Sequence, residues 1–469
     1  MHNQYSAVTD EIIRELQDIA GAQNVLTSED DKAKYARDEM PVTKTHYPDV
    51  VVKAGKTTTV SRILELANYK RIPVTPRGGG TGVCGGCVPL YGGIVLSVEE
   101  MNHIQEIDED NFVAVVEPGV TLADLYQATE ERGLYYPLYP GEKTATLGGN
   151  VATNAGGLRA VKHGVTRHFV LGLEAVLPTG EIINTGGKFV KSSTGYDLTQ
   201  LIVGSEGTLA IITKIMLRLI APPSRREVLC VPFTKLEDAI KSVPDILKHK
   251  ILPVGIEFLE RDILQIAQQF TGKELPLGDG EAFLLIIIEV DTDEDFYRVS
   301  EQISEVCKKN GAIETYIPGS ERATKDLLEA REKFYPAAKS TGPLEAADVV
   351  VPRSMIPEFV TRVKEISRKH GVPIVAYGHA GDGNVHVHPM SRGMDVDQWK
   401  ARLPNVFKDI YQAGASLGGV ISGEHGLGFD KKPYLNMALD KPPIELMKRI
   451  KKAFDPNTIL NPGKVFDYT

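Results

Sequence analysis

Hydrophobic positions in the first half of the chain change from a helical to a strand-like period within a few residues. Between Thr57 and Arg71, Val60, Ile63, Leu64 and Ala67 share one face of a helix. The apolar run Ile72–Thr75 follows directly and is typical of a buried strand. Similar patterns predict a helix at Thr121–Arg132 and strands at Gly93–Val98, Phe112–Glu117, Leu171–Leu177, Glu181–Thr185 and Thr208–Leu219.

A second pattern begins after Ala221, where Pro222 and Pro223 mark the best candidate for a domain boundary. Helical periods and strand-like runs interleave beyond it, which favours an α+β cap domain with an antiparallel sheet. The expected helices are Leu236–Leu247, Asp295–Lys308 and Ile356–Lys369, and the expected strands are Phe283–Val290, Ala347–Val351 and Ile374–Tyr377. We therefore divide the chain into a first domain (1–221), a substrate or cap domain (222–418) and a C-terminal segment (419–469) that returns to the first domain.

The composition is that of an ordinary globular enzyme, with 42% hydrophobic and 25% charged residues in a chain of 469. The net charge of −9 argues against nucleic acid as a partner, because phosphate binding needs a basic surface. The longest apolar run, near Phe283–Ile288, is too short to span a membrane. Since Met1–Glu15 lacks a signal-peptide core and four cysteines cannot form a disulfide scaffold, we expect a cytoplasmic location.

Two glycine-rich stretches are the first candidates for a binding site. Arg77–Gly82 contains four glycines directly after a predicted strand, and glycine lets backbone N–H groups converge on an anion. A tight connecting turn is the alternative. Gly148–Gly157 adds small and amide residues, and neither stretch matches the usual nicotinamide or ATP fingerprints. Two separated glycine loops favour a long cofactor with a diphosphate and an extended ring system.

Cys84 and Cys87 form a C-x-x-C pattern, which could be a redox dithiol or half of a zinc site. No second pair follows, because Cys230 and Cys307 are isolated. We therefore favour close packing beside the first glycine loop.

A histidine cluster is the second candidate site. His379 and His386 flank a glycine-rich turn between two strand-like runs, and His388 shares the face of His386 because side chains alternate along a strand. Two imidazoles with a carboxylate are a common divalent-metal set. Glu424 supplies a carboxylate and His425 a neighbouring base. A structural role is the alternative for any one histidine, but the cluster favours a metal.

The glycine motifs resemble the FAD-binding domain of the vanillyl-alcohol oxidase / p-cresol methylhydroxylase superfamily. The similarity rests on Ile72–Pro76, Arg77–Gly82, Gly148–Gly157 and Gly204–Leu209, and it extends from about Pro48 to Lys464. Within it the chain is similar to the branch of the glycolate oxidase FAD subunit, D-lactate dehydrogenases and D-2-hydroxyglutarate dehydrogenase. The resemblance implies an α+β fold, with a two-part FAD-binding domain and the antiparallel cap.

The resemblance implies that Arg77–Gly82 holds the diphosphate of FAD. The full set of residues that it places at the cofactor is Pro76, Arg77, Gly78, Gly79, Gly80, Thr81, Gly82, Pro140, Gly141, Thr146, Gly149, Asn150, Thr153, Gly156, Gly164, Val165, Glu206, Ile211 and Asn461. Some members attach FAD through a histidine in the first loop. Here those positions are Gly79, Gly80 and Thr81, so we expect non-covalent FAD.

The resemblance also implies roles in catalysis. It makes His379, His386 and Glu424 ligands of a divalent metal such as zinc, iron or manganese, His425 the catalytic base, and Arg331 the contact to the substrate carboxylate. On residue type alone, Arg331 could equally be a solvated helix charge.

Two departures from the related enzymes affect the expected substrate. His388 stands where the hydroxyglutarate enzymes carry asparagine, and it could be a third imidazole ligand or a substrate contact. Ala346 stands where those enzymes use a lysine. Because no cation is then available for a second carboxylate, a monocarboxylic acid is favoured over 2-hydroxyglutarate.

The resulting hypothesis is an FAD- and metal-dependent dehydrogenase that oxidises a D-2-hydroxy acid, D-lactate or glycolate first, to the 2-keto acid. Electrons would pass to an external acceptor, for example an electron-transfer flavoprotein or a partner subunit, and we expect an oligomer or complex. The alternatives are D-2-hydroxyglutarate or another alcohol as the substrate, and a non-catalytic flavoprotein subunit that only relays electrons.

Overall fold

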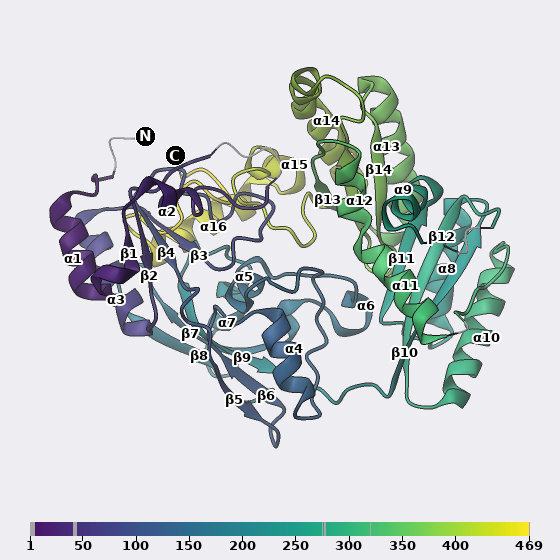
Figure 1. Ribbon diagram of the computed structural model, residues 1–469, viewed down its shortest axis with the longest axis horizontal. Helices are drawn as coiled ribbons and strands as arrows, with labels where there is room; N and C mark the ends of the chain where they lie inside the picture. Colours follow the sequence, from purple (N-terminus) through teal and green to yellow (C-terminus); the bar gives the residue numbers. More distant parts are fainter. Residues whose placement is uncertain (1–4, 41–44, 274, 276–277, 319, 469) are drawn as a thin grey trace. The chain divides into compact units, whose positions relative to one another are not determined.

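The computed structural model describes residues 5–40, 45–273, 275, 278–318 and 320–468. The chain forms two compact units (Figure 1). The first unit consists of residues 1–155, 165–222 and 424–469, and the second of residues 156–164 and 223–423. The first unit has two sheets and the second has one, and each unit has its own core.

The first unit contains two sheets. The strands of the four-stranded sheet, in the order β1-β2-β4-β3, are β1 (Val25–Leu26), β2 (Val50–Lys53), β4 (Ile94–Ser97) and β3 (Val74–Arg77). The strands of the five-stranded sheet, in the order β5-β6-β9-β7-β8, are β5 (Ile104–Asp108), β6 (Val113–Val116), β9 (Ile211–Arg218), β7 (Val170–Val176) and β8 (Ile182–Gly186). In the first sheet β2, β4 and β3 run parallel, whereas the second sheet is antiparallel throughout.

Helices cover these sheets through their apolar faces. In α3 (Thr57–Lys70) the predicted residues Val60, Ile63, Leu64 and Ala67 are fully buried against the parallel sheet. The other described helices of this unit are α1 (Asp10–Ala20), α2 (Glu29–Ala33), α4 (Leu122–Glu130), α5 (Leu147–Thr153), α7 (Leu198–Ile202), α15 (Leu435–Ala438) and α16 (Lys441–Phe454).

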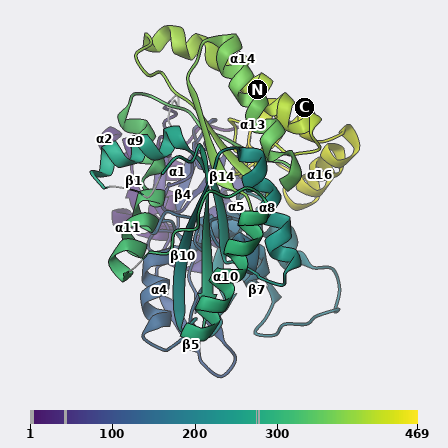
Figure 2. The same ribbon diagram turned by 90° about the vertical axis from the view of Figure 1, so that its right-hand side faces the viewer.

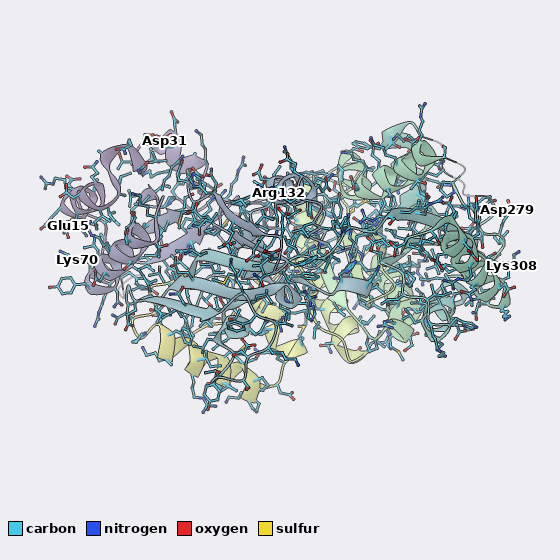
Figure 3. All side chains as sticks on the ribbon, turned by 90° about the horizontal axis from the view of Figure 1, so that it is seen from below. Glu15, Asp31, Lys70, Arg132, Asp279 and Lys308 are labelled. Atoms are coloured by element: carbon cyan, nitrogen blue, oxygen red, sulfur yellow. The ribbon has the colours of Figure 1, made fainter. Side chains whose placement is uncertain are left out.

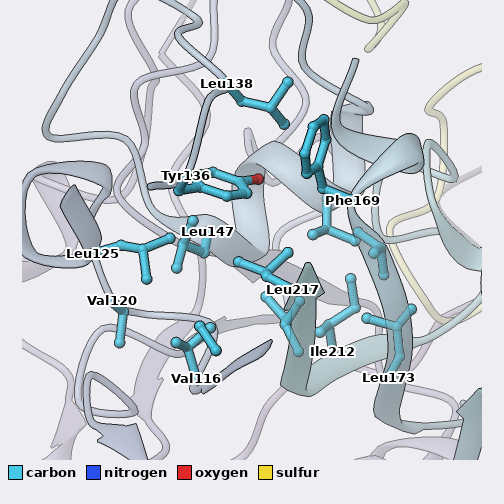
Figure 4. Close-up of a cluster of buried hydrophobic side chains, with 14 of the residues drawn as sticks. Val116, Val120, Leu125, Tyr136, Leu138, Leu147, Phe169, Leu173, Ile212 and Leu217 are labelled. Atoms are coloured by element: carbon cyan, nitrogen blue, oxygen red, sulfur yellow. The ribbon is translucent and has the colours of Figure 1, made fainter. Parts of the chain in front are cut away.

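A cluster of aliphatic and aromatic side chains fills the space between the five-stranded sheet and its helices (Figure 4). Leu125 of α4 and Leu147 of α5 pack beside Tyr136 and Phe169, whose rings meet edge-on with centroids 5.9 Å apart. The beginning of the second glycine stretch is therefore helical and held by a core residue, whereas the sequence pattern suggested only a loop.

The second unit is built on one antiparallel sheet of six strands, which confirms the antiparallel cap expected from the sequence. Its strands, in the order β10-β12-β11-β14-β15-β13, are β10 (Arg225–Phe233), β12 (Ala282–Val290), β11 (Gly255–Glu260), β14 (Ile374–His379), β15 (Asn384–Pro389) and β13 (Ala347–Val350). The strands are almost wholly buried, because helices cover both faces.

The helices of the second unit divide between the two faces of this sheet. Figure 2 shows α8 (Leu236–Lys248) and α10 (Asp293–Lys309) along one face. The opposite face packs on α9 (Arg261–Thr271), α11 (Glu321–Glu332) and α12 (Phe334–Ser340). The other described helices are α6 (Ala160–His163), α13 (Ile356–His370) and α14 (Val396–Ser416).

Charged side chains cover the outside of both units, among them Lys70 of the first and Lys308 of the second (Figure 3). Among the helices of the described residues, none is long and apolar enough to cross a membrane.

The C-terminal segment is fastened into the first unit by a buried ion pair. Both side chains of Lys451 and Asp455 are fully buried, with Nζ and Oδ2 2.5 Å apart. The ammonium also donates to the carbonyl oxygens of Thr208 at 2.6 Å and Leu460 at 2.8 Å. Leu460 in turn forms a parallel bridge with Val74 of β3. This one pair therefore ties the C-terminal segment to the strand that leads into the first glycine loop.

Removing the carboxylate from this pair should destabilise the protein strongly. In Asp455→Asn the ammonium of Lys451 stays buried without its counter-ion, and we expect a loss of about 3–5 kcal/mol in the free energy of unfolding. Urea unfolding measures the loss. The matched control is Glu445→Gln, which breaks a more exposed i,i+3 pair with Lys448 on the same helix and should cost less than about 1 kcal/mol. Equal stabilities of the two variants would contradict the anchoring role.

Candidate cofactor and metal sites

The first glycine loop begins where β3 ends, so Arg77 is both the last strand residue and the first loop residue. The loop lies against Thr146: the backbone N–H of Gly79 donates to Thr146 Oγ1 at 3.3 Å. A Cβ atom on Gly78 would stand 2.3 Å from the same oxygen, so no larger residue fits there. Within the first unit the first glycine loop thus lies against the residue that precedes α5, the helix that begins the second glycine stretch.

The Arg77 side chain contacts several other residues of the first unit. Its guanidinium donates to the carbonyl oxygen of Arg37 at 2.8 Å and to Cys87 Sγ at 3.1 Å, and it stands 5.5 Å from the centre of the Tyr35 ring. All four cysteines are free thiols, and burial raises the pKa of Cys84 well above its ordinary value. The C-x-x-C pattern therefore sits beside the loop as two thiols.

The second glycine stretch carries an amide that fits a ligand. Helix α5 contains Gly149, Asn150 and Thr153, and the Thr153 hydroxyl donates to the Gly149 carbonyl at 3.1 Å. Asn150 Nδ2 is buried and has no hydrogen-bond partner among the described residues. A buried donor of this kind is costly unless something accepts from it. Its position fits a bound cofactor.

Glu206, a predicted cofactor residue, contacts the C-terminal segment. Its buried carboxylate accepts from the backbone N–H groups of Leu427 at 2.8 Å and Gly428 at 2.7 Å. Burial raises the pKa of Glu206, although these two donors oppose the shift. Asn461 Nδ2 donates to the Glu206 carbonyl at 2.8 Å. Glu206 therefore joins the C-terminal segment to the cofactor-binding region of the first unit.

The remaining predicted cofactor residues are distributed along the two units. In the first unit, Gly141 has a left-handed backbone, Val165 begins the segment before β7, and Ile211 is a buried residue at the start of β9. Gly156 and Gly164 are the first and last residues of the segment 156–164, which belongs to the second unit. The glycine cradle and the Asn150 amide are the features that fit a diphosphate-containing cofactor.

Strand register places the candidate metal-site residues on one face of the second unit's sheet. In an antiparallel sheet, residues directly opposite each other point to the same side. Glu257 of β11 stands opposite His379, His386 opposite Tyr377, and Asp348 of β13 opposite His386. Four neighbouring strands therefore gather two imidazoles and two carboxylates, although their residues are far apart in the sequence.

The two histidines present their Nε2 atoms to each other at 3.3 Å. Two imidazole ligands of a tetrahedral ion, with bonds of about 2.0–2.1 Å, are separated by about 3.3–3.4 Å. The opposite ring nitrogens face carboxylates: His379 Nδ1 lies 2.5 Å from Glu257 Oε1, and His386 Nδ1 lies 3.9 Å from Asp348 Oδ1. Both rings are buried. This donor set fits a divalent cation between the Nε2 atoms.

Glu424 is joined directly to Gly423, whose backbone N–H donates to Asp348 Oδ2 at 2.8 Å. One candidate group of metal ligands consists of His379, His386 and Glu424. A second such group shares His386 and consists of Asp348, His386 and His425. These are the two sets of ligands that the described residues offer around His386.

His388 belongs to neither group. It shares the face of His386, but its ring stacks on Tyr377, with centroids 5.3 Å apart at 27°. Its Nδ1 lies 3.3 Å from the Glu345 carbonyl oxygen. Its ring therefore packs against an aromatic side chain and a backbone carbonyl in the second unit.

Arg331 lies near the end of α11 and makes an ion pair that the sequence did not suggest. Its Nε and Nη2 stand 2.7 Å and 2.5 Å from Glu257 Oε2, and its guanidinium lies 5.4 Å from the ring centres of Phe334 and Tyr377. Burial opposes ionisation of Glu257, but its contacts with Arg331 and His379 outweigh that effect and lower the carboxyl pKa. Glu257 is thus a site residue missed from the sequence, where the only signal was an acidic residue in an otherwise apolar strand.

Comparison with known proteins identifies both parts of the chain. Residues 48–186 match the family "FAD binding domain", and residues 222–465 match "FAD linked oxidases, C-terminal domain". A D-lactate dehydrogenase of Anaerostipes hadrus is 40% identical over 468 residues, with 98% of each chain covered. Glycolate oxidase subunit GlcD of Bacillus subtilis is 40% identical over 464 residues, covering 98% of this chain and 97% of the relative.

The fold is also that of a solved structure. A crystal structure of p-cresol methylhydroxylase with substrate bound superposes with a TM-score of 0.80 at 20% identity, covering 98% of this chain and 97% of that one. This likeness confirms the fold inferred from the glycine motifs. The chain is an FAD-dependent enzyme and belongs to the family of FAD-linked oxidases whose fold p-cresol methylhydroxylase shares.

Proposed function

We propose that this enzyme oxidises a small D-2-hydroxy acid, D-lactate or glycolate first, to the corresponding 2-keto acid with the help of a divalent metal. The observation that carries the proposal is the pair of buried imidazoles, His379 and His386, whose Nε2 atoms have the spacing of two metal ligands. The relatives named D-lactate dehydrogenase and glycolate oxidase subunit support the substrate class.

Each candidate site residue has one proposed role in binding or in proton transfer. When bound, FAD supplies a hydride acceptor at flavin N5, and a divalent ion at His379, His386 and Glu424 supplies Lewis acidity that lowers the pKa of a substrate hydroxyl. His425, as the neutral imidazole, takes the hydroxyl proton. Arg331 binds the substrate carboxylate with guanidinium N–H groups, while Glu257 holds its orientation.

Non-covalent FAD follows from the first loop. Gly79, Gly80 and Thr81 offer no side chain that could form a bond to the flavin. The close approach of this loop to Thr146 supports a role for its backbone N–H groups at the diphosphate.

The choice of a monocarboxylic substrate rests on Ala346, just before β13. The hydroxyglutarate enzymes have a lysine at this position, which could bind a second carboxylate, whereas alanine could not. D-2-hydroxyglutarate and other alcohols are therefore the second choice. A subunit that only relays electrons would need neither the histidine pair nor Glu257, so we favour catalysis. The reduced flavin would pass its electrons to an external acceptor, such as an electron-transfer flavoprotein or a partner subunit in a complex, and we propose a cytoplasmic enzyme.

Anaerobic mixing with candidate substrates tests the function most simply. We expect D-lactate or glycolate to bleach the flavin absorbance of the purified full chain within one turnover, with L-lactate far slower and D-2-hydroxyglutarate less effective. A flavin that stays oxidised with every 2-hydroxy acid would instead support the electron-relay alternative.

Replacing the proposed base should separate chemistry from binding. In His425→Ala we expect FAD to remain bound while substrate reduces it about 100- to 10,000-fold more slowly, which is the range for loss of a general base. Stopped-flow absorbance measures the reduction rate. Reduction at the wild-type rate would remove His425 from this role.

Metal removal tests the role of the histidine pair. A single proton shared between the two Nε2 atoms is the alternative to a cation at this spacing. Dialysis against a chelator should abolish flavin reduction by the hydroxy acid, and added Zn²⁺, Fe²⁺ or Mn²⁺ should restore it. Elemental analysis confirms the loss and return of the ion. Full activity in protein verified as metal-free would favour the shared proton and contradict the metal.

A further inference from the structure

Glu257 is a fully buried acidic side chain beside the histidine pair, and the function proposed above gives no role to its contact with His379. Its side chain has no exposed surface, in the middle of β11. Burying an ionised carboxylate costs several kcal/mol unless charged partners and hydrogen bonds offset the loss of water. Packing alone therefore does not explain a glutamate at this position, and its two contacts indicate its role.

The carboxylate divides its two oxygens between two partners. Oε1 faces His379 Nδ1 at 2.5 Å, and Oε2 faces Nε and Nη2 of Arg331 at 2.7 Å and 2.5 Å. Glu257 and His379 are also direct cross-strand neighbours, so the backbone fixes their contact. One rigidly placed side chain thus contacts a proposed metal ligand and the arginine proposed to bind the substrate.

This contact determines which nitrogen of His379 is available to a metal. An ionised carboxylate only accepts hydrogen bonds, so the ring nitrogen that faces it must carry the proton. With the proton on Nδ1, the lone pair of His379 is on Nε2, which points toward His386 Nε2. Carboxylates that hold metal-binding histidines in this way strengthen metal binding, and losing them weakens it by about 10- to 100-fold.

We propose that Glu257 is a positioning residue that orients both His379 for the metal and Arg331 for the substrate carboxylate. This inference rests on the proposed function. It predicts two separable effects of losing the carboxylate: weaker metal binding through His379, and a higher KM for the hydroxy acid through Arg331.

The same sheet offers a matched control in Glu289 of β12. Its side chain is 2% exposed and also joins an arginine and a histidine: Arg226 Nη2 lies 2.6 Å from Oε1, and His163 Nε2 lies 3.3 Å from Oε2. Glu289 therefore resembles Glu257 in burial and in pairing with an arginine and a histidine, with Lys162 as an additional partner 3.0 Å from Oε2. A change at Glu289 reports the general cost of losing a buried carboxylate.

The test compares Glu257→Gln with Glu289→Gln in the full chain loaded with FAD. A glutamine can keep at most one of the two contacts, because its NH₂ group faces either the Arg331 donors or His379 Nδ1. After removal of metal, Zn²⁺ affinity is measured by competition with a chromophoric chelator, together with FAD content and the KM and kcat for D-lactate. Glu257→Asp, which keeps the charge but shortens the side chain, is the second variant if Glu257→Gln does not fold.

We expect Glu257→Gln to bind Zn²⁺ about 10- to 100-fold more weakly than wild type, with normal FAD content and a raised KM at saturating metal. Glu289→Gln should keep wild-type affinity for Zn²⁺. The inference is overturned if wild type binds Zn²⁺ and Glu257→Gln or Glu257→Asp binds it equally well, or if Glu289→Gln loses it to the same extent. If wild type itself binds no Zn²⁺, Fe²⁺ or Mn²⁺, the proposed metal role fails instead.

Discussion

A fully buried carboxylate that needs a counter-ion on one oxygen and a hydrogen-bond donor on the other is the constraint on which the second unit depends. Glu257 meets it by holding Arg331 with one oxygen and His379 with the other. An unpaired charge in the interior is strongly destabilising, so movement of Arg331 or His379 away from Glu257 would cost folding free energy. The pairing therefore fixes a cation and an imidazole in space, on a sheet whose strands are themselves buried on both faces. A rigid arrangement of this kind is what a metal site and a substrate-carboxylate site both require.

In the first unit, buried polar contacts hold the first glycine loop in place. A loop that brings backbone N–H groups to an anion must be rich in glycine, and such a loop has little side-chain packing of its own. Here the surroundings hold it: Thr146 lies against Gly78 and Gly79, and the buried Lys451–Asp455 pair fastens the C-terminal segment beside β3. Glu206 adds a further tie by accepting from the backbone of Leu427 and Gly428. The C-terminal segment thus stabilises the cofactor region through polar contacts.

Much of this could be predicted from the sequence, because local patterns carry it. The period of apolar residues located α3 and β12 to within a residue or two, and the glycine motifs indicated the FAD-binding fold. The pairings between distant strands could not be predicted. Glu257 and His379 meet only because β11 lies beside β14, and no sequence period specifies that register. For the same reason neither the partner of Arg331 nor the contacts of Glu206 with Leu427 and Gly428 could be predicted. The helix at the second glycine stretch was not predicted because its glycines are poor helix formers.

X-ray absorption spectroscopy at the metal edge of the FAD-loaded chain reports the atoms around the ion and so tests whether His379 and His386 are its ligands. We expect two imidazole nitrogens at about 2.0–2.1 Å if the ion is zinc, with carboxylate oxygen completing the site, and the loss of one imidazole from the spectrum of His379→Ala. A first shell of sulfur at about 2.3 Å, or one made of oxygen alone, would contradict it.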